Sequence, residues 1–159
     1  MPENFSEVDI SKFNSNNFVM QFANLPEVTF FLHSVPFPSV NASVVNVNMP
    51  NFPIKYGMPS TTLDYGMLDC EILLDEKMDT YFSIYEWMLA NTKLANLSDY
   101  FTQGSILLFT NAKNLLMRVD LVDCFPTALG TFSLQVESSE FTTFSATFQF
   151  RNIKYTRFH

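Results

Sequence analysis

Charged residues are scarce in this sequence: they make up 16% of its 159 residues, against about 25% in an ordinary soluble domain. Lys and Arg together number nine and Asp and Glu sixteen, which gives a formal net charge of −7 at pH 7. Proteins that grip nucleic acid bind its phosphates mainly through Lys and Arg. The composition therefore excludes a basic nucleic-acid-binding protein, but not one that lets nucleic acid pass without holding it.

Glycine, cysteine and histidine are also rare, with four, two and two residues. Four glycines leave little material for a phosphate-cradling loop, and no such motif is present. Cys70 and Cys124 are too few for a disulfide framework and lie in apolar runs, so we expect both to be buried and reduced. His33 and His159 have no Cys or His partner at ligand spacing. We therefore expect no metal site and no cofactor.

Long apolar runs are missing as well. No run reaches the roughly 18 residues that a helix needs to span a bilayer, so we expect no membrane partner. The start of the chain, MPENFSEVDISKF, has neither the basic start nor the apolar centre of a signal peptide. We expect synthesis in the cytosol, where the glycosylation sequons at Asn41 and Asn96 stay unused.

Strand-forming residues are abundant by contrast. Hydrophobic residues make up 47% of the chain, including eighteen Phe and six Tyr, and aromatic residues are enriched in packed strands. The length is most simply that of one domain with a substantial core. So much apolar surface with so little charge favours a subunit that buries its sides against neighbours. The alternative is a monomeric all-β protein with a surface of Ser, Thr and Asn.

From Asn17 onward, most segments have the two-residue alternation of strands. The predicted strands cover residues 17–22, 28–35, 43–49, 66–75, 105–111, 115–125, 131–137 and 144–155. Residues 50–62 carry three prolines and predict an edge, a hairpin tip or a loop.

Two of the predicted strands separate polar from apolar side chains. In residues 66–75, Asp69 and Glu71 lie opposite Cys70 and Ile72. In the last strand one face carries polar side chains, namely Ser145, Thr147, Gln149 and Arg151. The other face carries Phe144, Ala146, Phe148 and Phe150. The apolar side switches near Ile153, which predicts a bulge or a strand that passes between two sheets.

One segment, ILLDEKMDTYFSIYEWM, predicts a strand followed by a helix. Asp79 is placed to cap the helix, with Asp75 and Glu76 just before its positive end. An apolar stripe at helical spacing is expected to face the core, formed by Tyr81, Ile84, Tyr85 and Met88. The acidic cluster is thus explained as a structural joint.

Catalysis finds no support in the sequence. The segment DEKMD lacks the glycine and the later Glu of a calcium loop. No nucleophile elbow and no local Cys–His pairing are present. Asp64 and Asp69 form a carboxylate pair of the kind that can act as acid and base, but any two carboxylates offer this. We predict that the chain is not an enzyme.

Four segments resemble, in order, the tail tube proteins of tailed bacteriophages, particularly those of contractile-tailed, T4-like phages. The segments are NNFVMQF…VTFFLHSVPFPSV, TTLDYGMLDCEILLDEKMDTYFSIYEWM, VDCFPTALG and FTTFSATFQFRNIKY. They extend over roughly residues 17–157 and include the acidic turn and a helix ending near Trp87. The N-terminal residues resemble the family only in character.

The resemblance implies a mainly β fold of two packed antiparallel sheets, a sandwich-like barrel with one flanking α-helix. Such subunits would form hexameric rings that stack into a hollow tube for genome ejection, and ring closure would remove exposed strand edges. The implied partners are further copies of the chain, the tail sheath and baseplate proteins, and DNA that passes without specific binding. The implied location is the virion tail, after synthesis in the host cytoplasm.

Three alternatives stay open. The first is a baseplate or tube-initiator subunit of the same fold, and the second is the tube protein of a related secretion or bacteriocin injection machine. The third, outside this class, is a small β-barrel hydrolase with an unrecognised carboxylate site.

The sequence pattern also divides the chain into an arm and a body. Residues 1–17 are polar and aperiodic, and we expect them to form a flexible arm that orders against a neighbouring subunit through Phe5, Ile10 and Phe13. Residues 18–159 form the single β domain.

The channel wall of such a tube should be polar or acidic, because basic groups would retain the DNA that has to leave. We therefore expect the two polar strand faces to line the lumen, with Asp69, Glu71, Ser145, Thr147 and Gln149. Arg151 shares a face with the last three, so we expect it near a rim or paired with a carboxylate.

Overall fold

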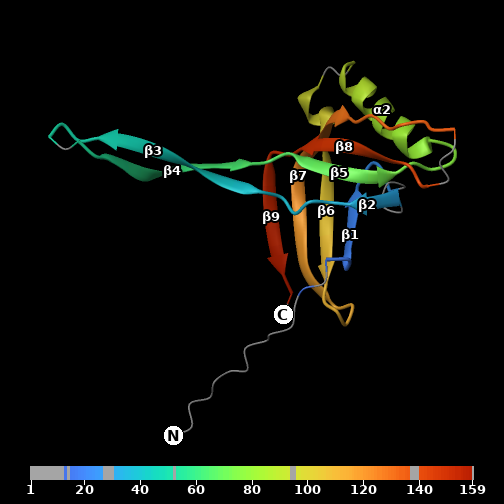
Figure 1. Cartoon of the computed structure of the whole chain (residues 1–159), viewed down its shortest axis with the longest axis horizontal. Helices are drawn as coiled ribbons and strands as arrows, with labels where there is room; N and C mark the ends of the chain where they lie inside the picture. Colours follow the sequence, from blue (N-terminus) through green and yellow to red (C-terminus); the bar gives the residue numbers. More distant parts are fainter. Residues whose placement is uncertain are drawn as a thin grey trace, which may run out of the picture.

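The chain folds mainly into β-strands (Figure 1). The computed structural model describes residues 13, 15–26, 31–51, 53–93, 96–136 and 140–158. Its strands are β1 (Phe18–Phe22), β2 (Leu32–Ser34), β3 (Val40–Asn48), β4 (Lys55–Tyr65), β5 (Leu68–Leu73), β6 (Thr102–Phe109), β7 (Leu115–Leu129), β8 (Thr143–Gln149) and β9 (Asn152–Arg157). The helical segments are α2 (Asp79–Asn91) and the short 3₁₀ helix η1 (Leu97–Tyr100). The predicted fold class, mainly β with a flanking helix, is confirmed.

Seven of these strands form one folded sheet in the order β1-β6-β7-β8-β5-β2, with β9 paired to β7 beside this path. All of their pairings are antiparallel. Layer 1 consists of β1, β6, β9 and residues 115–124 of β7. Layer 2 consists of β2, β5, β8 and residues 125–129 of β7. The two layers cross in Figure 1, where the strands of layer 1 run vertically and the strands of layer 2 run across them.

A bulge in β7 produces the corner between the layers. Thr102 pairs with Cys124 but Gly104 pairs with Leu121, so β7 holds one extra residue here. Within the bulge, Asp123 adopts a left-handed conformation with φ of 55°. A bulge of this kind bends and twists its strand, and β7 thereby leaves β6 and joins β8.

The predicted switch of faces near the C-terminus also falls at this corner. The chain leaves layer 2 at Gln149 and enters layer 1 at Asn152, so one predicted strand is in fact β8 followed by β9. The amide of Arg151 donates to the carbonyl of Val122 at 3.0 Å, which holds the two corners together.

The core lies between the inward faces of the two layers. Layer 1 contributes Met20, Phe22, Ile106, Val119 and Leu121, and layer 2 contributes Leu68, Cys70, Ile72, Phe144, Ala146 and Phe148. The rings of Phe22 and Phe148 meet at its centre, with centroids 4.6 Å apart. Because a Cβ on Gly104 would come within 3.3 Å of the Phe22 ring, glycine lets this ring lie flat on β6.

Helix α2 closes one end of the space between the layers. Its buried residues are Thr80, Ile84 and Trp87, and the Trp87 ring contacts Phe22 at 6.3 Å and Phe148 at 6.2 Å between centroids. The predicted stripe is therefore only partly right. Tyr85 is 48% exposed, because the buried face is centred on Ile84 and Trp87. In the described part of the chain, no helix is sufficiently long and apolar to cross a membrane.

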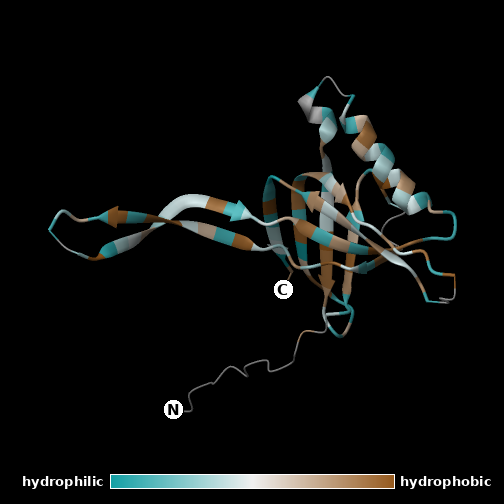
Figure 2. Cartoon of the chain, turned by 45° about the horizontal axis from the view of Figure 1, so that its top comes forward, coloured by the Kyte–Doolittle hydropathy of each residue, from teal (hydrophilic) through white to brown (hydrophobic). Residues whose placement is uncertain are grey.

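The remaining two strands, β3 and β4, form a hairpin that projects from the body (Figures 1 and 2). Among the described residues they pair only with each other, and every residue of β3 is exposed. An edge, a hairpin tip or a loop was predicted for residues 50–62; the structure shows a hairpin whose strand β4 itself contains Pro59. Pro59 is tolerated because a two-stranded ribbon has free edges.

The strand predicted over residues 131–137 is wrong. Residues 131–136 form no strand, β7 continues instead to Leu129, and residue 137 lies outside the described range. The alternation of Phe132, Leu134 and Val136 misled the prediction: Phe132 packs on Tyr81, but Leu134 and Val136 are exposed.

Candidate channel and assembly surfaces

The two polar strand faces predicted from the sequence form one continuous surface on layer 2. β5 and β8 are adjacent, with Asp69 opposite Thr147 and Glu71 opposite Ser145. The Thr147 hydroxyl donates to the Asp69 carboxylate at 2.6 Å. Cross-strand neighbours share a face of a sheet, and the residues between them are buried. The surface therefore points away from the core.

The third strand of layer 2 extends this surface. Thr127 of β7 donates its hydroxyl proton to the carbonyl of Thr147 at 3.2 Å. The Gly130 amide donates to the Ser145 carbonyl at 2.6 Å, and a Cβ on Gly130 would lie 2.0 Å from the Ser145 hydroxyl oxygen. Gln149 is exposed at the end of β8. We call the outward side of β5, β8 and residues 125–129 the polar face.

The polar face belongs to strands without Lys or Arg. The four strand segments of layer 2 are LHS, LDCEIL, TFSATFQ and residues 125–129, FPTAL. Asp69 and Glu71 are the only Asp, Glu, Lys or Arg residues in these segments. The strands of layer 1 carry cations, namely Arg118, Lys154 and Arg157. The two layers thus differ in the charge they present.

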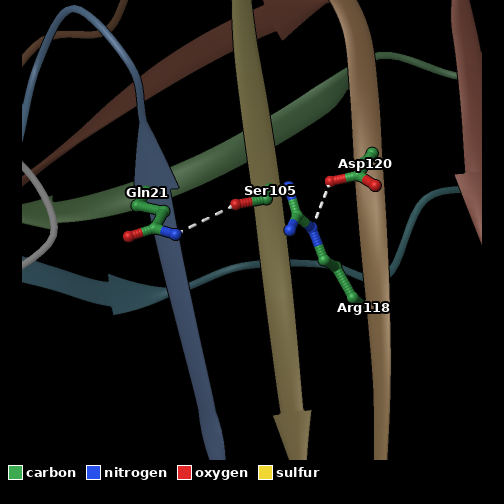
Figure 3. A network of polar contacts seen from close by, with 4 residues as sticks. All are labelled: Gln21, Ser105, Arg118 and Asp120. Atoms are coloured by element: carbon green, nitrogen blue, oxygen red, sulfur yellow. Dashed lines mark hydrogen bonds and ion pairs between the residues drawn. The ribbon is translucent and has the colours of Figure 1, made fainter. Parts of the chain in front are cut away.

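On layer 1, part of the positive charge is neutralised locally (Figure 3). The Arg118 guanidinium lies 2.6 Å from the Asp120 carboxylate, and Lys154 lies opposite Asp120 in the register of β7 and β9. In the same row of strands, the Gln21 side-chain amide donates to the Ser105 hydroxyl at 3.3 Å. This side of the molecule is a mixed, charged surface.

Arg151 lies at the corner between the layers and has a carboxylate partner, as predicted. Its guanidinium nitrogen is 3.4 Å from Asp123, and its charged group lies 4.4 Å above the centre of the Phe101 ring. These contacts draw the cation toward the corner and away from Thr147 and Asp69.

The acidic joint caps α2 through Asp75, and the prediction that Asp79 is the cap is wrong. Asp75 accepts hydrogen bonds from the amides of Asp79 and Thr80 at 2.9 and 3.1 Å and from the Thr80 hydroxyl at 2.6 Å. Asp79 is itself the first helical residue, and Met78 before it has a φ of 57°. This left-handed turn brings Asp75 back over the helix start, which sequence spacing alone did not indicate.

The same contacts set the ionisation of Asp75. Desolvation acts to raise its pKa, but the hydrogen bonds from Thr80 and Asp79 outweigh it and hold the pKa below the ordinary value. Glu76 is exposed and lines a hollow of about 570 Å³ together with Leu73, Leu74 and Phe141. Within the described residues, no three His, Cys, Asp or Glu side chains lie close enough to hold a metal ion.

Of the arm residues predicted to contact a neighbour, Phe13 is described and is more than half exposed. Phe5 and Ile10 lie outside the described residues. Asn17, which the prediction assigned to the arm, belongs to the body: it is buried, and its carbonyl accepts the Phe109 amide at 3.0 Å.

The other candidates for chemistry are separated. Asp64 lies on the hairpin and accepts a hydrogen bond from Ser43, whereas Asp69 is bonded to Thr147. His33 is exposed on β2, and His159 lies outside the described residues. Cys70 and Cys124 are buried and unbridged, as predicted, and burial raises the pKa of each thiol to about 12.

The sequence did not indicate that neither side of the strand predicted over residues 43–49 would pack against the core. Val45 and Val47 do alternate with Asn46 and Asn48, which usually marks a half-buried strand. Here both faces are exposed. The available signal was the neighbouring run of prolines, which is unfavourable in an interior strand.

The complete fold is shared with proteins of contractile injection systems. A chain from the tube-terminating cap of the anti-feeding prophage superposes with a TM-score of 0.74, at 14% identity and 99% coverage of both chains. A chain from the sheath–tube terminator of an extracellular contractile injection system gives a TM-score of 0.73 at 15% identity, with 94% of this chain and 99% of that chain covered. One from the extended sheath–tube complex gives 0.72 at 13% identity, with 94% and 95% covered. No family model matches the sequence, and no curated protein does.

These comparisons show a common fold: a two-layered β body with a flanking helix, present along almost the whole length of each chain. The fold predicted from the resemblance to tail tube proteins is the fold observed.

Proposed function

We propose that the chain is the repeating structural subunit of a contractile-tail tube, in which hexameric rings stack around a channel. Its fold is that of chains found in tube, terminator and cap assemblies. The proposed location is the tail of a virion or of a related particle, after synthesis in the host cytoplasm.

The observation that carries the proposal is the polar face of layer 2. We propose that this face lines the channel, with Asp69, Glu71, Ser145, Thr147 and Gln149 toward the lumen. Lys or Arg side chains on the channel wall would bind the phosphates of a passing duplex, release its counterions and hold it. The carboxylates repel the phosphates instead, and the hydroxyl and amide groups keep the wall hydrated.

The edges of layer 2 support ring closure. In the described chain, β2 pairs only with β5, and residues 125–129 of β7 form the opposite edge of the layer. Joining the β2 edge of one copy to the β7 edge of the next would extend layer 2 around the channel. Such head-to-tail contacts close into rings when the rotation allows, and they remove free strand edges.

With layer 2 toward the channel, the charged surface of layer 1 faces outward. We propose that it meets the surrounding sheath, and that the end rings meet baseplate proteins. We assign no catalytic role, because the potential acid–base residues are separated and hydrogen-bonded elsewhere. We propose no membrane partner.

A second candidate function is the tube of an injection machine that delivers protein. The solved structures of similar fold include extracellular contractile injection systems. Identification of the cargo distinguishes the two: tubes isolated from the producing cells carry nuclease-protected DNA in the first case and protein without DNA in the second.

Negative-stain electron microscopy of the purified full-length chain, combined with light scattering across a broad concentration range, tests the proposal. We expect rings or hollow rods and a mass that rises with concentration. A monomer at all concentrations contradicts the proposal and favours an initiator subunit or an unrelated barrel.

A further inference from the structure

Arg151 is the cation that comes nearest to the polar face along the chain. Residues 56–76 and 119–150, which contain β5, β8 and the β7 segment of layer 2, hold no Lys or Arg. Arg151 follows Gln149 of β8 by two residues, which is at most about 7 Å of chain. The long side chain of an arginine at this place can reach the edge of the polar face.

Contacts at the corner hold the Arg151 charge to one side. Its guanidinium nitrogen lies 3.4 Å from the Asp123 carboxylate, and its charged centre lies 4.4 Å from the centre of the Phe101 ring. The Phe101 ring packs on Phe125 with centroids 5.6 Å apart, and Phe125 pairs with Gln149 of the polar face. We call Asp123 and Phe101 the arginine clamp. The clamp therefore stands at the margin of the polar face.

The backbone fixes both partners of the ion pair. The Arg151 amide donates to the Val122 carbonyl at 3.0 Å, and Asp123 lies in the bulge with φ of 55°. Chain segments that are already held lose less conformational freedom when their side chains meet. A half-exposed ion pair alone contributes little, but the carboxylate and the aromatic face attract the same guanidinium to the same place. The clamp thus directs this charge without burying it.

An unclamped Arg151 would change the chemistry of the polar face. The charged residues on the strands of this face are Asp69 and Glu71, both carboxylates. A free guanidinium binds a phosphate through two parallel hydrogen bonds, and each such contact releases counterions from the duplex. In a symmetric ring every copy would present the same group. The wall would then retain the DNA that has to leave.

We propose that the arginine clamp withholds Arg151 from passing phosphates and thereby keeps the channel wall from retaining nucleic acid. Asp123 and Phe101 are positioning residues in this proposal, because they act by directing the guanidinium and not by touching the DNA. The inference rests on the proposed function, since it requires the polar face to line the channel.

DNA ejection from particles whose tubes consist of variant full-length chains tests the clamp. Asp123→Asn keeps the size of the side chain and removes the charge that holds Arg151, so ejection should slow at low salt. The slowing should fade by about 3.5-fold over a fourfold rise in salt for each phosphate that a freed guanidinium holds. Addition of Arg151→Gln to Asp123→Asn should restore the wild-type rate. If the ion pair only fastened the two layers, the double variant would be no better than the single one.

Asp120→Asn is the matched control. Arg118 and Asp120 form another Arg–Asp pair on β7, 2.6 Å apart, with an exposure similar to that of the corner pair (Figure 3). The net charge changes equally in both variants, but Asp120 lies on layer 1, so its substitution should leave the ejection rate unchanged. If Asp123→Asn does not assemble, Phe101→Leu takes its place. It loosens the clamp without removing the carboxylate, and we expect a smaller slowing.

Slowing by Asp123→Asn that Arg151→Gln reverses supports the clamp. Wild-type rates in Asp123→Asn, equal slowing by Asp120→Asn, or no recovery in the double variant overturns it. The variant Asp69→Lys with Glu71→Lys separates the clamp from the proposed function. If that variant slows ejection and Asp123→Asn does not, the channel assignment stands and the clamp fails. If neither slows ejection, or if the tubes carry protein without DNA, the clamp and the DNA channel both fail.

Discussion

The Arg151 guanidinium lies 3.4 Å from the Asp123 carboxylate, which ties the β8–β9 corner to the bulge of β7. Both residues occupy the points where the chain crosses between layers, and Asp123 does so with a left-handed backbone. Side-chain and backbone contributions at Asp123 can therefore be separated by substitution.

We predict that Asp123→Asn lowers the free energy of unfolding by at most about 1 kcal/mol, since a half-exposed ion pair contributes little. Asp123→Ala should cost a further 1–2 kcal/mol or so, because Asn tolerates the left-handed conformation and Ala does not. Urea denaturation followed by Trp87 fluorescence measures both values. Equal stability of the two variants contradicts the prediction.

The cap of α2 gives a second prediction. Asp75→Ala should cost about 1 kcal/mol, and Asp79→Ala should cost less, since Asp79 makes no cap hydrogen bond. The pKa of Asp75 is lower in the folded chain than in the unfolded one. Its contribution is therefore present above the unfolded value of about 3.9 and is lost as the pH falls through the folded value.

Urea denaturation at pH 7 and at several values below pH 4 tests this. The stability difference between wild type and Asp75→Ala should shrink as the pH falls. A difference that is constant over this range, or a larger cost for Asp79→Ala, would show that Asp75 is not the cap.

The position of α2 gives a third prediction. Trp87→Ala should lower the free energy of unfolding by about 3–5 kcal/mol, because it opens a cavity between Phe22 and Phe148. Tyr85→Ala should cost under about 1 kcal/mol in the lone subunit, since its ring is half exposed. Thermal denaturation followed by circular dichroism compares them. A larger loss of stability for Tyr85→Ala than for Trp87→Ala would contradict the burial of the Trp87 side of α2.

The buried thiols predict loss of stability in alkali. Cys70 and Cys124 have a pKa of about 12 in the folded chain and about 8.5 when unfolded. Between these values only the unfolded chain ionises, so each thiol lowers the free energy of unfolding by up to about 1.4 kcal/mol per pH unit. Below pH 8 the effect is absent.

The control for the thiols is the double variant Cys70→Ala, Cys124→Ala. Its stability at pH 7 should be lower because of the lost volume, but its decline between pH 8.5 and 10 should be shallower than that of wild type. Parallel declines would indicate that other groups cause the alkaline loss.

The polar face gives a final prediction. Asp69→Lys with Glu71→Lys should still assemble but slow the release of DNA, most strongly at low salt, where screening is weak. The matched control is Gln21→Lys on layer 1, outside the proposed channel. Ejection kinetics of particles carrying each variant measure the effect. Equal slowing by both variants, or a tube structure with Asp69 and Glu71 on its outer surface, would place the channel elsewhere.

The alternation of polar and apolar residues correctly predicted strands that pack one face against the core. Asp69 and Glu71 against Cys70 and Ile72 gave β5 its correct orientation, because burial of one face fixes the register. The existence of α2 was predictable for the same reason. Its cap was not, because the left-handed turn at Met78 depends on three-dimensional packing rather than on spacing.

The errors fall where apolar alternation has no partner within the chain. Residues 131–136 alternate without a neighbouring strand, and residues 43–49 alternate on a projecting hairpin. Apolar alternation indicates that one face of a strand is suited to burial. It does not indicate whether the surface that covers this face belongs to the same molecule. The charge difference between the layers was visible only after the strand order was known.

The continuity of β7 has a mechanical consequence. Residues 115–129 belong first to the layer with Arg118 and then to the layer with Thr127. A load applied to one layer therefore reaches the other along covalent bonds as well as through packed side chains. The layers cannot slide past each other without straightening the bulge at Asp123, so the subunit should resist shear across its thickness more than it resists bending of the hairpin.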